Sequence, residues 1–491
     1  MPDRRIASLL FMFFGVLSDV SFERSSAAEN PAAREFVMFP FDDHAVPFNK
    51  GVLLTMIPGE KSPPIVKLGP KGAPDDRRVY FSGTIIKVGD EYRMWYSGYD
   101  RAANRRVCYA VSKDGLKWEK PALGLIDYNG DKENNLVAID GGKPISGALC
   151  LVLHDPEDPN PARRFKMMRE FDPYNQCKGA FSPDGLTWTS AGGDKFLVTG
   201  EPSGLIKYKG LYYMNAHSGA IRHPVPGAHK RTMQTFVSYD FENWTTAAHM
   251  SFRRDNIPPR PPTDFEFNRG PQVHLGASLW DRGNVILGFY GMYDNPTNDR
   301  RDSRCDIGLL VSPDALHFKE PVPDFKVVPS FEELDRAEPR LVQGQAFENI
   351  GDKTYHYYGI WTETNRDGPT GVRIATWDRD RLGHFRPAQG IPEPHCISCP
   401  IALENRAGRV FVNADALSEE SRLTVELLDE RFRPIAGYSG DECIPIDTKG
   451  LRTPVKWKTH DVVDGDVGPI RVRINWIGAD PVGRLFAAYV E

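Results

Sequence analysis

The chain has 491 residues, of which 40% are hydrophobic, and a formal net charge of −5 at pH 7. This length suffices for two or three domains with apolar cores. We expect no nucleic-acid partner, because such proteins carry a basic surface and this chain is slightly acidic. Aromatic residues at 11%, together with 44 Gly and 40 Pro, favour a turn-rich β protein over a helical one.

The N-terminal residues have the layout of a secretory signal peptide. Two arginines precede an apolar run over 6–17, and small residues follow at 25–28. The run is shorter than a membrane-spanning helix, and cleavage after Ala28 fits the pattern. The sequence therefore predicts a signal peptide over 1–28 and a secreted or periplasmic protein without a membrane anchor after cleavage. A proline-rich arm with few periodic runs follows over 29–79.

Two motifs then recur in step along the chain. The first is a Gly-containing start, an apolar strand, a tight turn and an aromatic strand, with copies at Gly83, Gly147, Gly204, Gly276 and Gly344. The second reads Ser-x-Asp-x-x-x-Trp or Phe, at 112–118, 182–188, 238–244 and 312–318, with a looser copy at 376–385. Two motifs in register at a spacing of about 65 residues indicate a repeat architecture.

Each repeat predicts four short antiparallel strands. In the first copy these are 81–88, 92–98, 107–112 and a fourth that opens at Trp118. Four such strands are typical of a β-propeller blade, which buries its apolar surface only against neighbouring blades. We therefore predict an all-β fold with a five-bladed β-propeller over 80–391. The aromatic residue that ends each second motif is expected to wedge between blades, and its Asp to cap its own turn.

The remaining residues predict a second β domain. Alternating apolar and polar residues at 409–413, 423–428, 470–476 and 485–490 are typical of half-buried strands. We predict a C-terminal β-sandwich over 392–491.

Strand order sorts the connections of the propeller onto two faces. The turns between first and second strands are short. The longer connections lie on the opposite face and carry unexplained polar residues, at 99–106, 170–176, 217–232, 293–304 and 362–371. Because functional loops gather on one side of a rigid scaffold, a ligand is expected on this second face, at the ring axis.

Metal and disulfide signals are weak. The segment 127–131 resembles the opening of a calcium loop but lacks its later Gly and Glu, so a simple turn is the stronger interpretation. We therefore expect no cofactor, with structural calcium as the weaker alternative. Among seven cysteines, Cys396 and Cys399 predict a small buried pair or a local disulfide rather than a metal site.

Two segments resemble the five-bladed propeller glycoside hydrolases of the invertase-like family 32 and arabinanase-like family 43. These are 81–97, similar to their first-blade strand pair, and Glu-Pro-Ser-Gly-Leu at 201–205, similar to their third-blade stretch. The Ser-x-Asp turns and the C-terminal sandwich are also similar. The resemblance implies that Glu201 is the general acid. Ser82 and, approximately, Ser146 stand where these families have Asp.

Glycoside hydrolysis usually needs a second carboxylate. The preferred partners of Glu201 are Asp264 and Glu338, on the segments that enter the fourth and fifth repeats. Further acidic candidates are Asp75, Asp76, Asp100, Asp172 and Glu363. The residues expected to bind the sugar are Tyr80, Ser82, His217, Glu266, Arg269, Asp335, Arg340 and Trp361. For each, ion pairing or packing within the fold is the structural alternative.

The expected function is that of a secreted glycoside hydrolase. It would release terminal sugars from a plant or algal poly- or oligosaccharide by carboxylate acid/base catalysis. The alternative is a non-catalytic carbohydrate-binding propeller, motivated by Ser82 and Ser146. A polysaccharide lyase or a glycoside phosphorylase is a third interpretation.

Overall fold

A computed structural model describes residues 35–147, 149–171, 176–193, 195–217, 231–254, 270–297, 299–330, 340–360, 370–479 and 481–491. Throughout these ranges the regular structure is β-strand, and the described helices are 3-10 turns of three residues. The predicted all-β class is confirmed. No helix within the described ranges is long and apolar enough to cross a membrane. The predicted signal peptide lies outside them.

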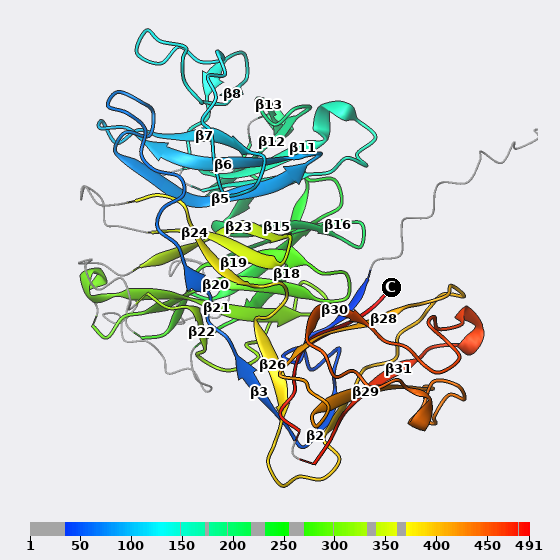
Figure 1. Cartoon of the computed structure of the whole chain (residues 1–491). Coiled ribbons are helices and arrows are strands. Elements are labelled where there is room, and N and C mark those ends of the chain that lie inside the picture. The colour runs from blue at the N-terminus through cyan, green and yellow to red at the C-terminus, as the bar shows by residue number, and fades with distance from the viewer. Residues whose placement is uncertain are drawn as a thin grey trace, which may run out of the picture. The chain divides into compact units, whose positions relative to one another are not determined.

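The repeats form antiparallel sheets that follow one another along the chain (Figure 1). We number the repeats one to five in chain order. Their strands are β5 (Arg78–Val88), β6 (Glu91–Tyr99) and β7 (Arg105–Ser112); β10 (Cys150–His154), β11 (Phe165–Phe171), β12 (Gln176–Ser182) and β13 (Thr187–Ser190); β15 (Glu201–Tyr208), β16 (Leu211–His217), β17 (Met233–Ser238) and β18 (Trp244–Phe252); β19 (Gln272–Asp281), β20 (Ile286–Asp294), β21 (Arg304–Ser312) and β22 (Lys326–Val328); β23 (Leu341–Ile350), β24 (Lys353–Ile360) and β25 (Arg373–Asp378). Short strands β8 (Ala138–Ile139), β9 (Lys143–Pro144) and β14 (Val198–Thr199) extend the second sheet.

The first strand of each repeat faces the ring interior. β5 contacts β10, β10 contacts β15, β15 contacts β19, β19 contacts β23, and β23 contacts β5 again. These contacts close the described strands into a ring. The first repeat differs from the prediction at its outer edge, since Trp118 opens no strand there and only a single bridge joins Val111 to Glu119.

The recurring glycine marks a β-bulge in the inner strand. Pairing with the second strand shifts register between Pro202 and Gly204 in β15, and at the equivalent places in β5, β19 and β23. A Cβ on Gly204 would collide with the backbone oxygen of Ala277 in the next repeat, and one on Gly344 with the ring of Phe81. Glycine is therefore required where inner strands of neighbouring repeats approach closely.

The side chain of Gln343 in β23 forms hydrogen bonds with polar groups near the bulges of two other inner strands. The amide nitrogen of Gln343 donates to Ser203 Oγ (3.0 Å) and to the carbonyls of His274 (2.9 Å) and Gly276 (2.8 Å). Gln343 is fully buried. Because buried carbonyls need donors, this side chain ties the inner strands of the third, fourth and fifth repeats together.

The Ser-x-Asp motif closes its own turn, as predicted. In the first repeat Ser112 Oγ accepts from Gly115 N (2.8 Å), and Asp114 Oδ1 accepts from the backbone of Leu116 (2.9 Å) and Lys117 (2.8 Å). Asp184, Asp240 and Asp314 make the same pair of bonds in the next three repeats. These aspartates are structural.

Hydrogen bonds also join these turns to aromatic side chains of neighbouring repeats. Trp95 of the first repeat donates from its indole to Gly185 O of the second (2.8 Å), and Tyr357 of the fifth donates to Gly115 O of the first (2.9 Å). Trp188 is 1% exposed and Phe318 is 7% exposed. These two aromatic residues are buried as the prediction of packing wedges requires.

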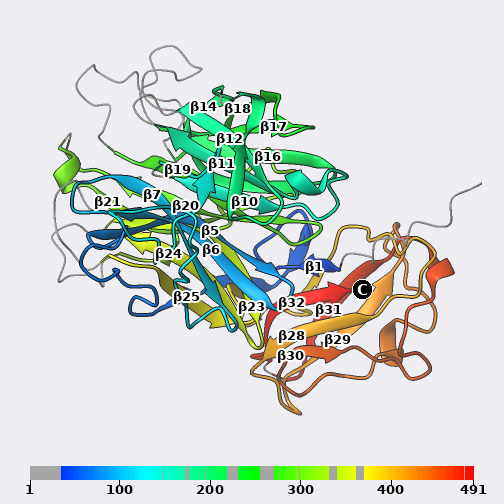
Figure 2. The same ribbon diagram turned by 90° about the horizontal axis from the view of Figure 1, so that it is seen from above.

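The C-terminal residues form two further sheets (Figure 2). Their strands are β26 (Gly383–Pro387), β27 (His395–Ile397), β28 (Val410–Asp415), β29 (Arg422–Leu428), β30 (Gly450–Pro454), β31 (Arg471–Ile477) and β32 (Arg484–Val490). The bounds of the four strands expected from alternation thus agree with those of β28, β29, β31 and β32 to within two residues. One shared core includes Val412, Val425, Trp457 and Ile474.

The N-terminal arm contributes strands to both parts of the chain. These are β1 (Phe36–Met38), β2 (Phe48–Lys50), β3 (Val52–Met56) and β4 (Glu60–Lys61), which pair with β32, β27, β26 and β25 respectively. The outer strand of the fifth repeat is therefore β4 from the arm. The segment that the sequence assigns to this position, β26, instead pairs with β3 and β32. An added strand covers an edge that β25 would otherwise leave open.

Candidate functional site

Glu201 and His217 form a hydrogen-bonded pair at the inner end of the third repeat. Glu201 begins β15, His217 ends β16, and the two residues are directly opposite each other in the ladder. His217 Nε2 lies 3.1 Å from Glu201 Oε2. The His217 side chain is 2% exposed, whereas that of Glu201 is 25% exposed. The Glu201 carboxyl group is thus accessible to solvent, whereas the His217 side chain is buried.

The proton position on His217 follows from its second contact. The backbone N–H of Leu275, in the bulge of β19, donates to His217 Nδ1 at 2.7 Å. Leu275 has φ of 63°, the left-handed conformation. Because Nδ1 accepts this bond, the neutral ring carries its proton on Nε2 and donates it to Glu201. One oxygen of Glu201, Oε2, therefore accepts this bond.

An apolar cluster collects side chains from several repeats beside this pair. Its members are Tyr80, Tyr99, Leu149, Leu275 and Val342. They come from β5, β6, the approach to β10, β19 and β23, so the cluster lies where inner strands of different repeats meet. The rings of Tyr80 and Tyr99 are 6.2 Å apart and nearly perpendicular.

The pKa of Tyr80 reflects its burial and the charged groups around the cluster. Burial raises the pKa of its phenol well above the ordinary value, and the neighbouring Tyr99 phenol and the carboxylates of Glu201 and Glu170 raise it further. The phenol therefore stays protonated and can donate a hydrogen bond. Two carboxylates, Glu201 and Glu170, act on this one hydroxyl.

Two arginine side chains lie near the Tyr99 ring. The guanidinium groups of Arg78 and Arg105 sit 5.1 and 5.5 Å from the centre of its ring. Burial raises the pKa of Tyr99, while Arg105 and Arg78 act in the opposite direction. The site thus combines carboxylates, phenols and guanidinium groups, which are the groups that bind sugar hydroxyls.

The structure places some predicted residues and leaves others outside its described ranges. Tyr80, Glu201 and His217 meet at the site. Ser82 is buried, and its hydroxyl has no hydrogen-bond partner among the described residues. Arg340 is fully buried and donates from Nη1 to Ser303 Oγ at 3.2 Å. The predicted residues outside the described ranges are Asp172, Asp264, Glu266, Arg269, Asp335, Glu338, Trp361 and Glu363.

Glu170, Tyr99 and Arg78 were not singled out from the sequence. Glu170 follows Met168 at a spacing of two in β11, so a charged residue occupies a position on the face that Met168 buries. That break in alternation is a signal that the sequence contains. Tyr99 and Arg78 are an aromatic and a basic residue at strand ends, which no local pattern distinguishes.

The described residues form neither a metal site nor a disulfide. No group of three or more His, Cys, Asp or Glu is positioned there to hold a metal ion. In the segment that resembles a calcium loop, Gly130 N donates to Asp127 Oδ1 (2.9 Å), which makes a turn. All seven cysteines are free thiols, so the local disulfide between Cys396 and Cys399 is not formed.

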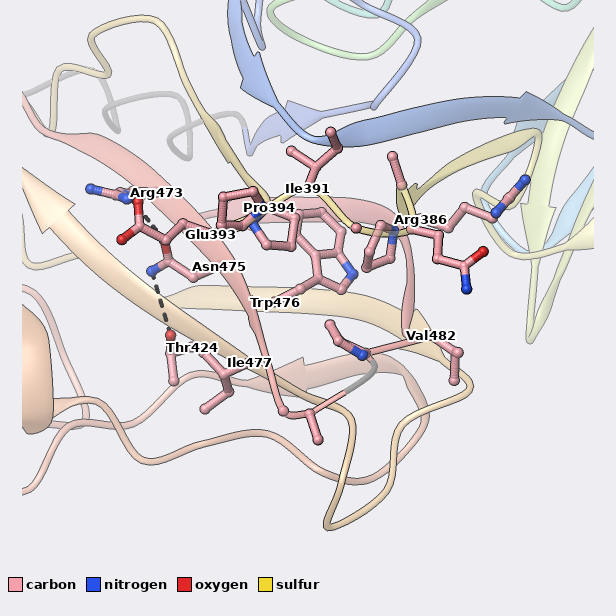
Figure 3. Close-up of a pocket in the computed structure, with 18 of the residues that line it drawn as sticks. Arg386, Ile391, Glu393, Pro394, Thr424, Arg473, Asn475, Trp476, Ile477 and Val482 are labelled. Carbon is pink, nitrogen blue, oxygen red and sulfur yellow. Dashed lines mark hydrogen bonds between the residues drawn. The ribbon is translucent and has the colours of Figure 1, made fainter.

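A groove of about 1040 Å³ lies in the C-terminal part, beside β29 and β31 (Figure 3). Arg473 donates to Asn475 (2.8 Å), whose amide donates to Glu426 (3.0 Å). The indole of Trp476 is buried and donates to Gly483 O (2.7 Å). These polar groups bond to one another, and the indole face is not exposed for stacking on a sugar.

The described chain is therefore an all-β protein of propeller type with a carboxylate–histidine pair at the ring centre. No protein-family model matches it. No curated protein matches it either.

Solved structures of carbohydrate-active enzymes are similar to this chain in fold. One is described as belonging to the GH130 family of mannoside phosphorylases, with glycoside hydrolases that target β-1,2 mannosidic linkages in Candida mannan (15% identity, 64% of this chain, 93% of that chain, TM-score 0.40). A glycosyl hydrolase from Bacteroides ovatus gives 16% identity, 67% and 96% coverage, and a TM-score of 0.42. A family 43 arabinoxylan arabinofuranohydrolase from Bacillus subtilis gives 11%, 87% and 99%, and 0.38. At such values function must come from the residues of this chain.

Proposed function

We propose that this protein is a carbohydrate-active enzyme, a glycoside hydrolase that releases terminal sugars from a plant or algal poly- or oligosaccharide. The observation that carries the proposal is the Glu201–His217 pair at the ring centre. A part-exposed carboxyl group with one oxygen hydrogen-bonded to a fixed donor has a defined orientation. Neighbouring Tyr80 is a buried hydroxyl donor, suited to a sugar oxygen.

The proposed role of Glu201 is that of the proton donor. Because His217 holds Oε2, the proton in this role is given from Oε1. In hydrolysis this proton passes to the glycosidic oxygen as the bond from that oxygen to the anomeric carbon breaks. A water molecule supplies the hydroxyl group that joins the anomeric carbon, and a second carboxylate takes the proton of that water. From the sequence alone, Asp264 and Glu338 are the candidates for this second group.

A non-catalytic carbohydrate-binding protein is the second candidate. The observation that favours it is Ser82, which stands where the similar hydrolase families have an Asp and cannot serve as a base. Both candidates use the same site residues to hold a sugar. They differ in whether the glycosidic bond is broken.

The test is sugar release from a panel of plant and algal glycans by the purified protein and its Glu201→Gln variant. We expect Glu201→Gln to lower release at least 100-fold, since general acid catalysis contributes about 10²–10⁴-fold. The matched control is Glu91→Gln, because Glu91 has a similar side-chain exposure of 28% but pairs with Lys113 at the surface.

Several outcomes would contradict the proposal. Unchanged release in Glu201→Gln would remove Glu201 from the reaction. Tight glycan binding without released sugar at any pH would favour the binding protein. Products that absorb in the ultraviolet would indicate a lyase, and a strict requirement for inorganic phosphate would indicate a phosphorylase.

A further inference from the structure

The strand register directs Glu170 toward the third repeat. Glu170 lies directly opposite Cys177 in the antiparallel pair of β11 and β12. Residues opposite each other in such a pair have side chains on the same face of the sheet. Cys177 Sγ lies 3.2 Å from the carbonyl oxygen of Gly200, the residue before Glu201. The face that carries Glu170 is therefore the face that meets the start of β15.

A second observation places the backbone of Glu170 next to the cluster that contains Tyr80. Its backbone N–H donates to Leu149 O at 3.1 Å, and Leu149 belongs to the cluster with Tyr80 and Tyr99. Glu170 is 7% exposed. Burial raises the pKa of the Cys177 thiol, with Glu170 and Glu201 adding to this effect, as they do at Tyr80. The charges of both carboxylates thus act on the same two groups.

We propose that Glu170 is the second carboxylate of the reaction, the general base that faces Glu201 across the sugar. This inference rests on the proposed function and deepens it. The oxygen of a water molecule bonds to the anomeric carbon, and the proton of that water passes to Glu170. The bond from the anomeric carbon to the glycosidic oxygen breaks, and that oxygen receives the proton of Glu201. The second repeat thereby supplies the carboxylate that is missing at Ser82.

The assignment also explains why the second carboxylate is not found by position in the repeat. In the similar families the additional acids stand at the inner strands. Glu170 instead lies on the second strand, β11, at the end that reaches the centre. Its backbone bond to Leu149 fixes this strand end beside the inner strand of its own repeat.

The experiment compares Glu170→Gln, Glu201→Gln and the surface control Glu91→Gln on the glycan that the intact protein cleaves best. We expect Glu170→Gln to lower kcat at least 100-fold with KM within threefold, and to remove the acidic limb of the pH–rate profile, where the base must be ionised. Glu201→Gln should remove the alkaline limb. Circular dichroism and thermal unfolding verify that each variant is folded.

Glu170→Ala provides a second measurement, because a misfolded variant could not regain activity when azide is added. Azide needs no base to attack, so sodium azide should restore turnover and give a glycosyl azide product. The inference is overturned if Glu170→Gln keeps kcat within fivefold while Glu201→Gln is inactive, or if azide has no effect on a folded Glu170→Ala protein. If Glu201→Gln is fully active, the proposed function itself fails.

Discussion

Replacing His217 with phenylalanine removes two hydrogen bonds while nearly keeping the bulk of the ring. One is the bond from Leu275 N–H to Nδ1 (2.7 Å), and the other is the bond from Nε2–H to Glu201 (3.1 Å). Leu275 is 2% exposed, so its N–H is left buried without this acceptor. An orphaned buried donor costs about 1–3 kcal/mol, and we expect the free energy of unfolding to fall by that amount.

The effect on catalysis is separate. A hydrogen bond to a charged group contributes about 1.5–3 kcal/mol. If the bond to Glu201 holds the carboxyl group in its reactive orientation, its loss should lower kcat by about 10- to 100-fold, at about 1.4 kcal/mol for each factor of ten. Initial rates of sugar release at saturating substrate measure kcat, and urea unfolding followed by tryptophan fluorescence measures stability.

His356→Phe is the matched control. His356 is fully buried in the same ring of sheets, and its ring packs 4.6 Å from those of Phe289 and Phe347, far along the chain from Glu201. This variant should keep wild-type kcat whatever its stability. A His217→Phe protein that is folded and retains at least half of the wild-type kcat would refute the reasoning that His217 orients Glu201.

Two further predictions concern the fold. Gly204→Ala should lower the free energy of unfolding by about 3 kcal/mol, because the added Cβ meets the backbone oxygen of Ala277. Gly89→Ala, at φ of 60° with open space around it, should cost only about 1–2 kcal/mol, and equal losses in urea unfolding would contradict the close-approach argument. The second concerns Asp100: burial opposes its ionisation, but hydrogen bonds from Asn104, Arg106 and Tyr128 hold its pKa at about 2. Because this value lies below the unfolded value of about 3.9, Asp100 stabilises the fold above pH 4, and this stabilisation is lost as the pH falls toward 2. The difference in Tm between wild type and Asp100→Asn should therefore shrink between pH 5 and pH 2, and a constant difference would refute it.

The candidate site was only partly predictable, for a physical reason. Glu201 stands in a distinctive local stretch, and His217 ends the strand that pairs with it, so both could be named from the sequence. Glu170 breaks the alternation of its strand, but this local signal does not say which residues its side chain faces. Its importance depends on its cross-strand register with Cys177 and on the hydrogen bond from Cys177 to Gly200, which lies 23 positions further along the chain.

The chain sequence by itself determined the all-β class, the recurring glycine and Ser-x-Asp motifs, and the alternating strands of the C-terminal part. These follow from local rules, because turn chemistry and side-chain alternation act within a few residues. Only the tertiary structure decided that β4 of the arm completes the fifth repeat, that His217 carries its proton toward Glu201, and that the backbone of Glu170 bonds to Leu149. Each of these depends on a contact between segments distant in sequence, and such contacts form only when the ring is closed.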